Sequence, residues 1–220
     1  MTDTYWSSHF ERELYELNWR GLSGSADLWR VVLDLLPAIG AQSRVFGSVV
    51  GAIRVARRAE GELAFEEWDV DADPAPLRRR LDSLEGVPDP IELPLRCKPA
   101  LWLPDDRVQI IDYDDADYFT IGGATLAPVS GEREGCLSLK LWRVLEAPVN
   151  LLTLEVVFGQ DEPATGMLLQ INSQCDLWST TRLDGEPGAA HNVANASHLA
   201  QAVEAIALAT GAEITQRPPG

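Results

Sequence analysis

The chain has 220 residues, of which 45% are hydrophobic and 24% are charged, proportions typical of a folded globular protein and not of a disordered one. Thirty-four acidic residues against 18 basic ones give a formal net charge of −16 at pH 7. This balance argues against binding to nucleic acid or to an anionic membrane, because both need clustered cations. The length suits a single domain over residues 1–220, with the proline-rich stretch near 86–100 as the candidate sub-boundary.

The acidic excess is concentrated in the middle of the chain. Residues 61–130 carry sixteen acids and six bases, whereas residues 1–60 carry seven of each. Like charges at this density repel one another unless they are solvated or paired with cations. Two interpretations follow: a solvated surface that keeps the protein in solution, or a surface that meets a positively charged partner.

The N-terminal half predicts helices and one strand. A capping-box pattern at Ser8 and Glu11 favours a helix reaching Leu17, although residues 15–20 alternate as a strand would, and both alternatives stay open. A second helix is expected to begin at Ser25 and to end around residues 37–40.

The next stretch mixes elements. Residues 43–59 suit either helix or strand, and residues 62–70 alternate as a strand. A short basic helix is expected over residues 77–84. Four prolines between residues 88 and 99 exclude a helix and imply an extended, loop-rich crossing.

The second half is rich in predicted strands. Residues 107–113 and 118–121 read as strands separated by an acidic turn. Three further runs, residues 137–145, 150–158 and 167–172, are expected to form an antiparallel meander because short turns join them.

A last helix closes the chain. Asn195 or Ser197 is expected to cap it, and Gly211 to stop it. The side chains expected to face inward are Leu199, Val203, Ile206 and Leu208. The predicted fold class is therefore α+β: N-terminal helices, an antiparallel β-sheet (meander) in the second half and a closing C-terminal helix packed on the sheet.

No motif in the sequence fixes a reaction. A P-loop, a dinucleotide-binding glycine pattern, a nucleophile elbow and a zinc helix are all absent. Asp69 to Asp73 begins like a calcium loop, but Pro74 stands where that loop needs glycine and Arg80 where it needs glutamate. His191 and His198 favour polar surface or capping roles over catalysis. We predict no catalytic residue, no metal site and no cofactor.

Two further observations bear on location. The first twenty residues lack the apolar run of a signal peptide, and no stretch is long and apolar enough for a membrane span. Three widely spaced cysteines fit a reducing compartment better than a disulfide framework: Cys97, Cys136 and Cys175. We expect a cytoplasmic protein.

The segment from residue 105 to residue 118 is the candidate binding surface, because its carboxylates are interleaved with Tyr113 and Tyr118. Carboxylates accept paired hydrogen bonds from arginine, and aromatic rings supply rigid contact area. The alternative interpretation is an ordinary acidic β-turn. The candidate partner-binding residues are Asp105, Asp106, Asp112, Tyr113, Asp114, Asp115, Asp117 and Tyr118. Most of the seven tryptophans are expected in the core, with one or two at an interface.

The C-terminal quarter carries a resemblance to a bacterial family type. A strand at residues 167–172 leads to a Ser-x-x-Asp-Leu-Trp segment at 173–178, then to a Gly/Pro-rich loop through 184–185, and Asn-Ala-Ser-His-Leu at 195–199 opens the last helix. This pattern resembles small cytoplasmic immunity proteins encoded beside polymorphic toxins, in particular α+β types paired with nuclease toxins. The resemblance implies an inhibitor of a toxin and assigns no site residue.

Three hypotheses follow. The first is an acidic binding protein that occludes the basic active site of a nuclease-like toxin, with no direct contact to nucleic acid or membrane. The second is a small metal-dependent enzyme that uses the Asp-rich segment, with His191 or His198 as base. The third is a non-catalytic subunit of a larger assembly.

Overall fold

The computed structural model describes the chain in stretches between residues 12 and 217. These are residues 12–59, 62–97, 100–102, 108–110, 112–113, 119–121, 124–126, 153–159, 166–173, 178–181, 187–188 and 190–217. The helices in these stretches are α1 (Ser25–Gly40), α2 (Ser43–Phe46), α3 (Ala75–Asp82) and α4 (Ala190–Thr210).

The strands fall into one large sheet and two small ones. The large sheet contains β1 (Arg12–Arg20), β2 (Val49–Ala59), β3 (Glu62–Asp71), β4 (Asp89–Cys97), β10 (Thr153–Phe158), β11 (Gly166–Ser173) and β12 (Glu213–Gln216). The small sheets contain β5 (Ala100–Trp102) with β6 (Val108–Ile110), and β7 (Asp112–Tyr113) with β8 (Phe119–Ile121) and β9 (Ala124–Leu126).

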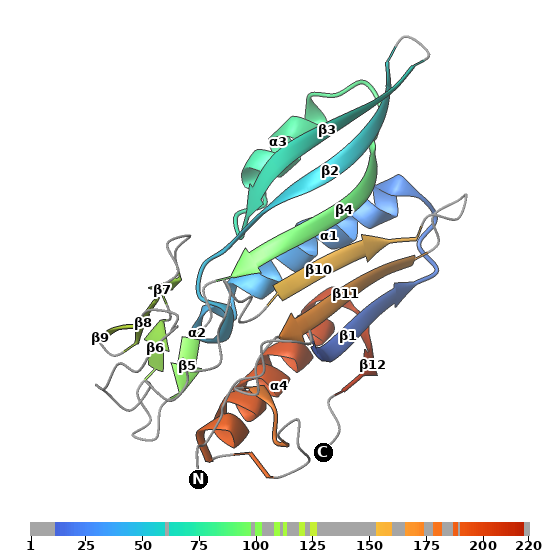
Figure 1. Ribbon diagram of the computed structural model, residues 1–220. Helices are drawn as coiled ribbons and strands as arrows, with labels where there is room; N and C mark the ends of the chain where they lie inside the picture. Colours follow the sequence, from blue (N-terminus) through green and yellow to red (C-terminus); the bar gives the residue numbers. More distant parts are fainter. Residues whose placement is uncertain are drawn as a thin grey trace.

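The large sheet is antiparallel, and its strand order is β12-β1-β11-β10-β4-β2-β3 (Figure 1). The hairpin of β10 and β11 confirms the pairing expected for the second and third runs of the meander. The first run, residues 137–145, lies outside the described residues. The sheet also takes β1 to β4 from the first half of the chain, so it joins the two halves of the sequence.

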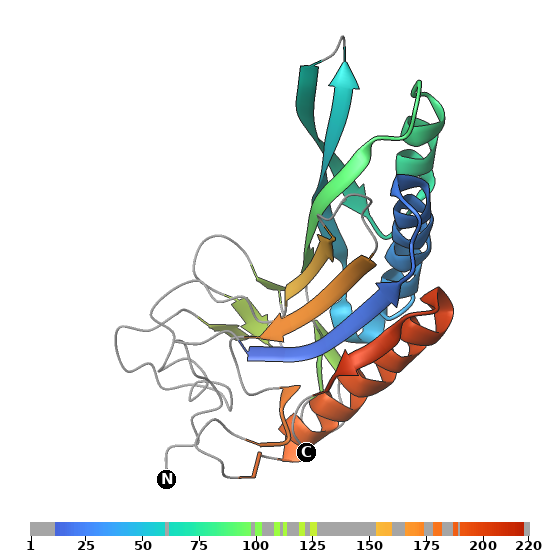
Figure 2. The ribbon, with the colours of Figure 1, turned by 90° about the vertical axis from the view of Figure 1, so that its right-hand side faces the viewer.

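Helices α1, α3 and α4 lie on one side of this sheet (Figure 2), and α1 packs against α4. The core forms between these helices and the covered sheet face, which contributes a buried residue at alternate positions of each central strand. The predicted α+β class, with a C-terminal helix packed on the sheet, is confirmed.

Residues 12–20 form a strand, which decides between the two alternatives that the sequence left open. Tyr15, Leu17 and Trp19 are buried at every second position and lie opposite three buried residues of β11. The helix expected to reach Leu17 is therefore wrong over residues 12–17, because burial of alternate side chains overrides the local helical spacing. Residues 1–11 lie outside the described residues.

The two other helices of the first half are confirmed. Helix α1 begins at Ser25 and ends at Gly40, with Pro37 in its last turn. Helix α3 spans Ala75–Asp82 and begins two residues before the expected start. The ambiguous residues 43–59 divide into α2 and the long strand β2.

Helix α4 differs from its prediction in two respects. It begins at Ala190, so the expected cap Asn195 is a buried residue inside the helix. Leu208, expected to face inward, is 88% exposed, because two residues after the buried Ile206 the helix has turned through about 200°. Gly211 ends the helix with a φ of 71°, as predicted. Within the described residues, no helix combines the length and the apolar character that crossing a bilayer requires.

The proline-rich stretch forms β4, which pairs with β2 on one side and β10 on the other. The prediction of an extended segment is confirmed, but the segment is a central strand and not a loop-rich crossing. Pro94 lies opposite Glu155 of β10. On the other side of β4, Leu95 and Glu92 both pair with β2, but the ladder is interrupted between them, where Pro94 lies. Since proline has no N–H to donate, β4 accommodates it at the cost of one interrupted pairing.

Candidate functional site

The predicted binding segment is described only in part. Asp112 and Tyr113 form β7, which pairs with β8. The single strand expected over residues 107–113 is wrong, because Val108–Ile110 forms β6 and pairs with β5 in a different small sheet. The other predicted partner-binding residues lie outside the described residues: Asp105, Asp106, Asp114, Asp115, Asp117 and Tyr118. The binding role of this segment stays a prediction.

The described residues include two of the three histidines and one of the three cysteines. His191 and His198 both lie in α4, and His198 is half-buried. Burial raises the pKa of the Cys97 thiol to about 12, so this thiol stays protonated at neutral pH. In the described part of the chain, no group of three His, Cys, Asp or Glu side chains could hold a metal ion.

An acidic surface lies on β3, on the side of the sheet away from the helices. We call it the acidic strand face and define it by five exposed side chains: Leu63, Phe65, Glu67, Asp69 and Asp71. Leu63 is 58% exposed and Phe65 53% exposed. Since side chains of a strand alternate between the two faces, the apolar half and the acidic half of this surface form one continuous row along β3.

The neighbouring strands continue this face. Arg54 of β2 lies opposite both Glu67 of β3 and Glu92 of β4. Its guanidinium is 3.4 Å from the Glu92 carboxylate and 5.1 Å from the centre of the Phe65 ring. Glu67 and Asp69 make no ion pair among the described residues, so Arg54 neutralises one of several carboxylates on this face.

The opposite face of β3 is anchored in the core. Trp68 is 1% exposed, and its ring stacks on Trp29 of α1 with 5.7 Å between ring centroids. Its indole N–H donates to the Glu66 carboxylate at 2.9 Å, and the Arg80 guanidinium lies 4.4 Å from its ring centroid. Glu66 also pairs with Arg57 at 3.0 Å and with Arg80 at 3.3 Å. These contacts tie β3 to β2, α1 and α3.

Carboxylates on the two faces of β3 therefore differ in the hydrogen-bond donors and cations that lie near them. The pKa of Glu66 lies below its ordinary value of 4.5, chiefly because Trp68 donates a hydrogen bond to it, with further contributions from Arg57 and Arg80. On the acidic strand face, Glu67 and Asp69 are exposed and have no such donors among the described residues. Their charges are available to a partner.

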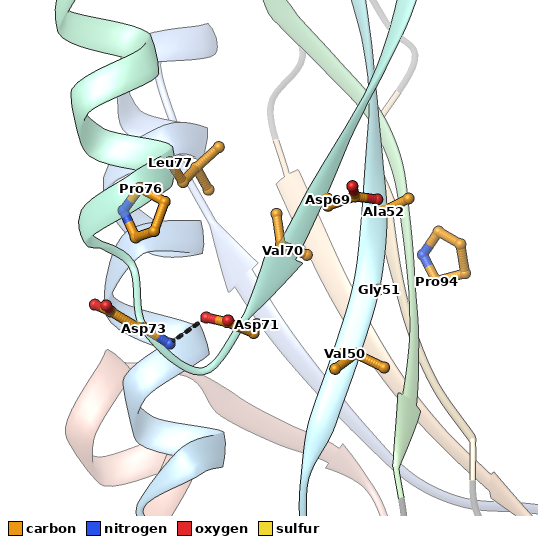
Figure 3. A pocket seen from close by; sticks show the side chains of 10 residues that line it. All are labelled: Val50, Gly51, Ala52, Asp69, Val70, Asp71, Asp73, Pro76, Leu77 and Pro94. Atoms are coloured by element: carbon orange, nitrogen blue, oxygen red, sulfur yellow. Dashed lines mark hydrogen bonds between the residues drawn. The ribbon is translucent and has the colours of Figure 1, made fainter.

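A groove of about 700 Å³ adjoins the acidic strand face where β3 leads into α3 (Figure 3). The residues that line it are Val50, Gly51, Ala52, Asp69, Val70, Asp71, Asp73, Pro76, Leu77 and Pro94. The Asp71 carboxylate accepts the backbone N–H of Asp73 at 2.7 Å, and the Asp73 carboxylate accepts that of Ala75 at 3.0 Å. These two carboxylates hold the turn into α3, as aspartates do in turns, whereas the Asp69 side chain lies beside Ala52 and its carboxylate makes no hydrogen bond in the described part of the chain.

Sequence reasoning predicted the strand at residues 62–70 but did not select it as a site. The signal is present in the printed sequence: Glu62–Asp71 reads ELAFEEWDVD, with five acids, no base, and acidic and apolar residues alternating from Glu67 to Asp71. Its exposed position at the end of the sheet depends on the strand order, which the local pattern does not contain.

Comparison of the chain with protein-family models, with curated proteins and with solved structures finds no match in any of the three. The candidate site therefore depends on the geometry and charge of the described residues alone.

Proposed function

We propose that this chain is an acidic binding protein of the immunity or antitoxin type, which neutralises a cationic protein by covering its basic active site. The observation that carries the proposal is the acidic strand face, where exposed carboxylates without described cation partners stand beside exposed Leu63 and Phe65. A nuclease toxin is the partner class that fits, because an enzyme that acts on nucleic acid presents a cationic site to its substrate.

The physical basis is electrostatic complementarity. With a net charge of −16, the chain attracts a cationic protein over long distances and accelerates the encounter, an effect that salt weakens. The carboxylates then accept hydrogen bonds from arginine or lysine of the partner. Leu63 and Phe65 supply apolar surface from which water is excluded on binding.

The acidic segment from residue 105 to residue 118 is part of this proposal as a second contact region. Its composition of carboxylates and tyrosines matches that of the acidic strand face, which combines carboxylates with Leu63 and Phe65. We also propose the cytoplasm as the place of action, since an odd number of widely spaced cysteines suits a reducing compartment.

The test is the protein encoded next to this chain's gene. We expect it to carry a basic domain that stops bacterial growth when expressed alone, and we expect coexpression of this chain to restore growth. The purified pair should form a complex whose affinity falls as the salt concentration rises. A neighbour that is acidic or harmless, or growth arrest that this chain does not relieve, would contradict the immunity role.

A further inference from the structure

Strand β3 is the last strand of the large sheet. It pairs with β2 along its whole length, from Glu62 opposite Ala59 to Asp71 opposite Val50. In an antiparallel ladder, alternate residues direct their N–H and C=O groups to opposite sides. Half of the backbone groups of this ten-residue strand therefore point away from β2, and no described residue bonds to them.

Exposed strand edges of this length invite pairing with another chain, and proteins discourage wrong pairings with charge. Strand β3 carries five carboxylates and no cation. A second copy of this chain would place its own five carboxylates against them, and like charges in adjacent strands destabilise the pair. The same charges favour a strand that carries lysine or arginine.

The side chains at this edge specify such a strand further. Glu67, Asp69 and Asp71 follow one another at alternate positions, and Leu63 and Phe65 continue the row toward the tip of the hairpin. A complementary strand has cations at alternate positions beside the three carboxylates and apolar residues beside Leu63 and Phe65. The edge of this added strand that faces away from β3 then becomes the new edge of the sheet.

We propose that β3 binds its partner by strand addition: an extended basic segment of the cationic protein joins the sheet as a further strand beside β3. This inference rests on the proposed function, and it names the way in which the acidic strand face is used. Backbone hydrogen bonds along the edge supply affinity, and the alternating carboxylates supply specificity for cations.

A ten-residue peptide that alternates lysine and valine is the probe. In a strand, the lysine amides point to one edge and the valine amides to the other. Two isomeric peptides, methylated either on the lysine amides or on the valine amides, keep the same charge but each lose hydrogen bonding at one edge. Their affinities are measured by calorimetric titration and compared with that of the unmethylated peptide.

Strand addition uses one edge of the peptide, so one isomer should keep the affinity of the parent peptide and the other should bind at least about tenfold more weakly. Amide hydrogen exchange of β3 should slow at alternate residues when the peptide is bound. Equal binding by both isomers would overturn strand addition and leave the proposed function intact, because charge alone would then explain the affinity.

Two other outcomes would also overturn the proposal. Absence of binding by the unmethylated peptide would remove the acidic strand face from the proposed function as well. A molecular mass that rises with concentration, and that returns to the monomer value when Phe65→Asp is introduced, would assign the edge to a second copy of this chain.

Discussion

On the helix side of β3, Trp68 is almost fully buried between Trp29 and Arg80, while on the open side of the same strand Glu67 and Asp69 are exposed and make no ion pair among the described residues. The first face contributes to stability through packing and paired charge. The second has few contacts to lose, so its residues are free to serve a partner. The comparison predicts that substitutions on the helix side of β3 lower the free energy of unfolding, whereas substitutions on the open side weaken partner binding.

The largest effect on stability is expected from Trp68→Ala. The substitution removes the stacking on Trp29 and leaves a cavity beneath α3, at a cost of about 3–5 kcal/mol in the free energy of unfolding. Urea denaturation followed by circular dichroism measures this cost. Trp68→Phe, which keeps most of the buried volume, should lose much less, and equal losses for both variants would show that the hydrogen bond to Glu66 matters more than packing.

A smaller and pH-dependent effect is expected from Glu66. Since hydrogen bonds and nearby cations lower its pKa in the folded state below the ordinary 4.5, its contribution is fully present above pH 4.5 and is lost as the pH falls through the folded-state pKa. The Tm of Glu66→Gln should therefore be lower than that of the unaltered protein at neutral pH and approach it in acid. A difference that stays constant with pH would contradict the assignment of this carboxylate as paired.

The smallest effect on stability is expected on the open side. Leu63→Ser and Phe65→Ser should change the free energy of unfolding by no more than about 0.5 kcal/mol, because both side chains are more than half exposed. A loss of stability comparable to that of Trp68→Ala would show that these residues pack against part of the protein and are not free for a partner.

The sequence predicted much of the fold because the periodicity of single elements is local. The alternation over residues 62–70, the helix from Ser25 and the hairpin of β10 and β11 all follow from patterns within a few residues. The order of the strands depends on contacts between distant segments. Thus neither β1 in the sheet nor the central position of the proline-containing β4 was evident.

The candidate site was harder to predict for the same reason. Dense negative charge drew attention to residues 105–118, where the interpretation depends on composition alone. Strand β3 carries fewer acidic residues than that segment. They are relevant to binding because β3 lies at the end of the sheet, where Trp68 is buried on one face and the carboxylates are exposed on the other. That distinction requires the tertiary structure.

The central claim, that the exposed carboxylates of β3 attract a cationic partner, can be tested with two variants of equal net charge. One combines Glu67→Gln with Asp69→Asn on the acidic strand face, and the other combines Asp34→Asn with Glu85→Gln, which are exposed residues of α1 and of the turn after α3. The measurement is the association rate of the lysine–valine peptide at low salt. We predict that the association rate of the first variant is lower than that of the unaltered protein by a factor of about three or more, while that of the second variant differs little. Equal association rates for the two variants would contradict the account.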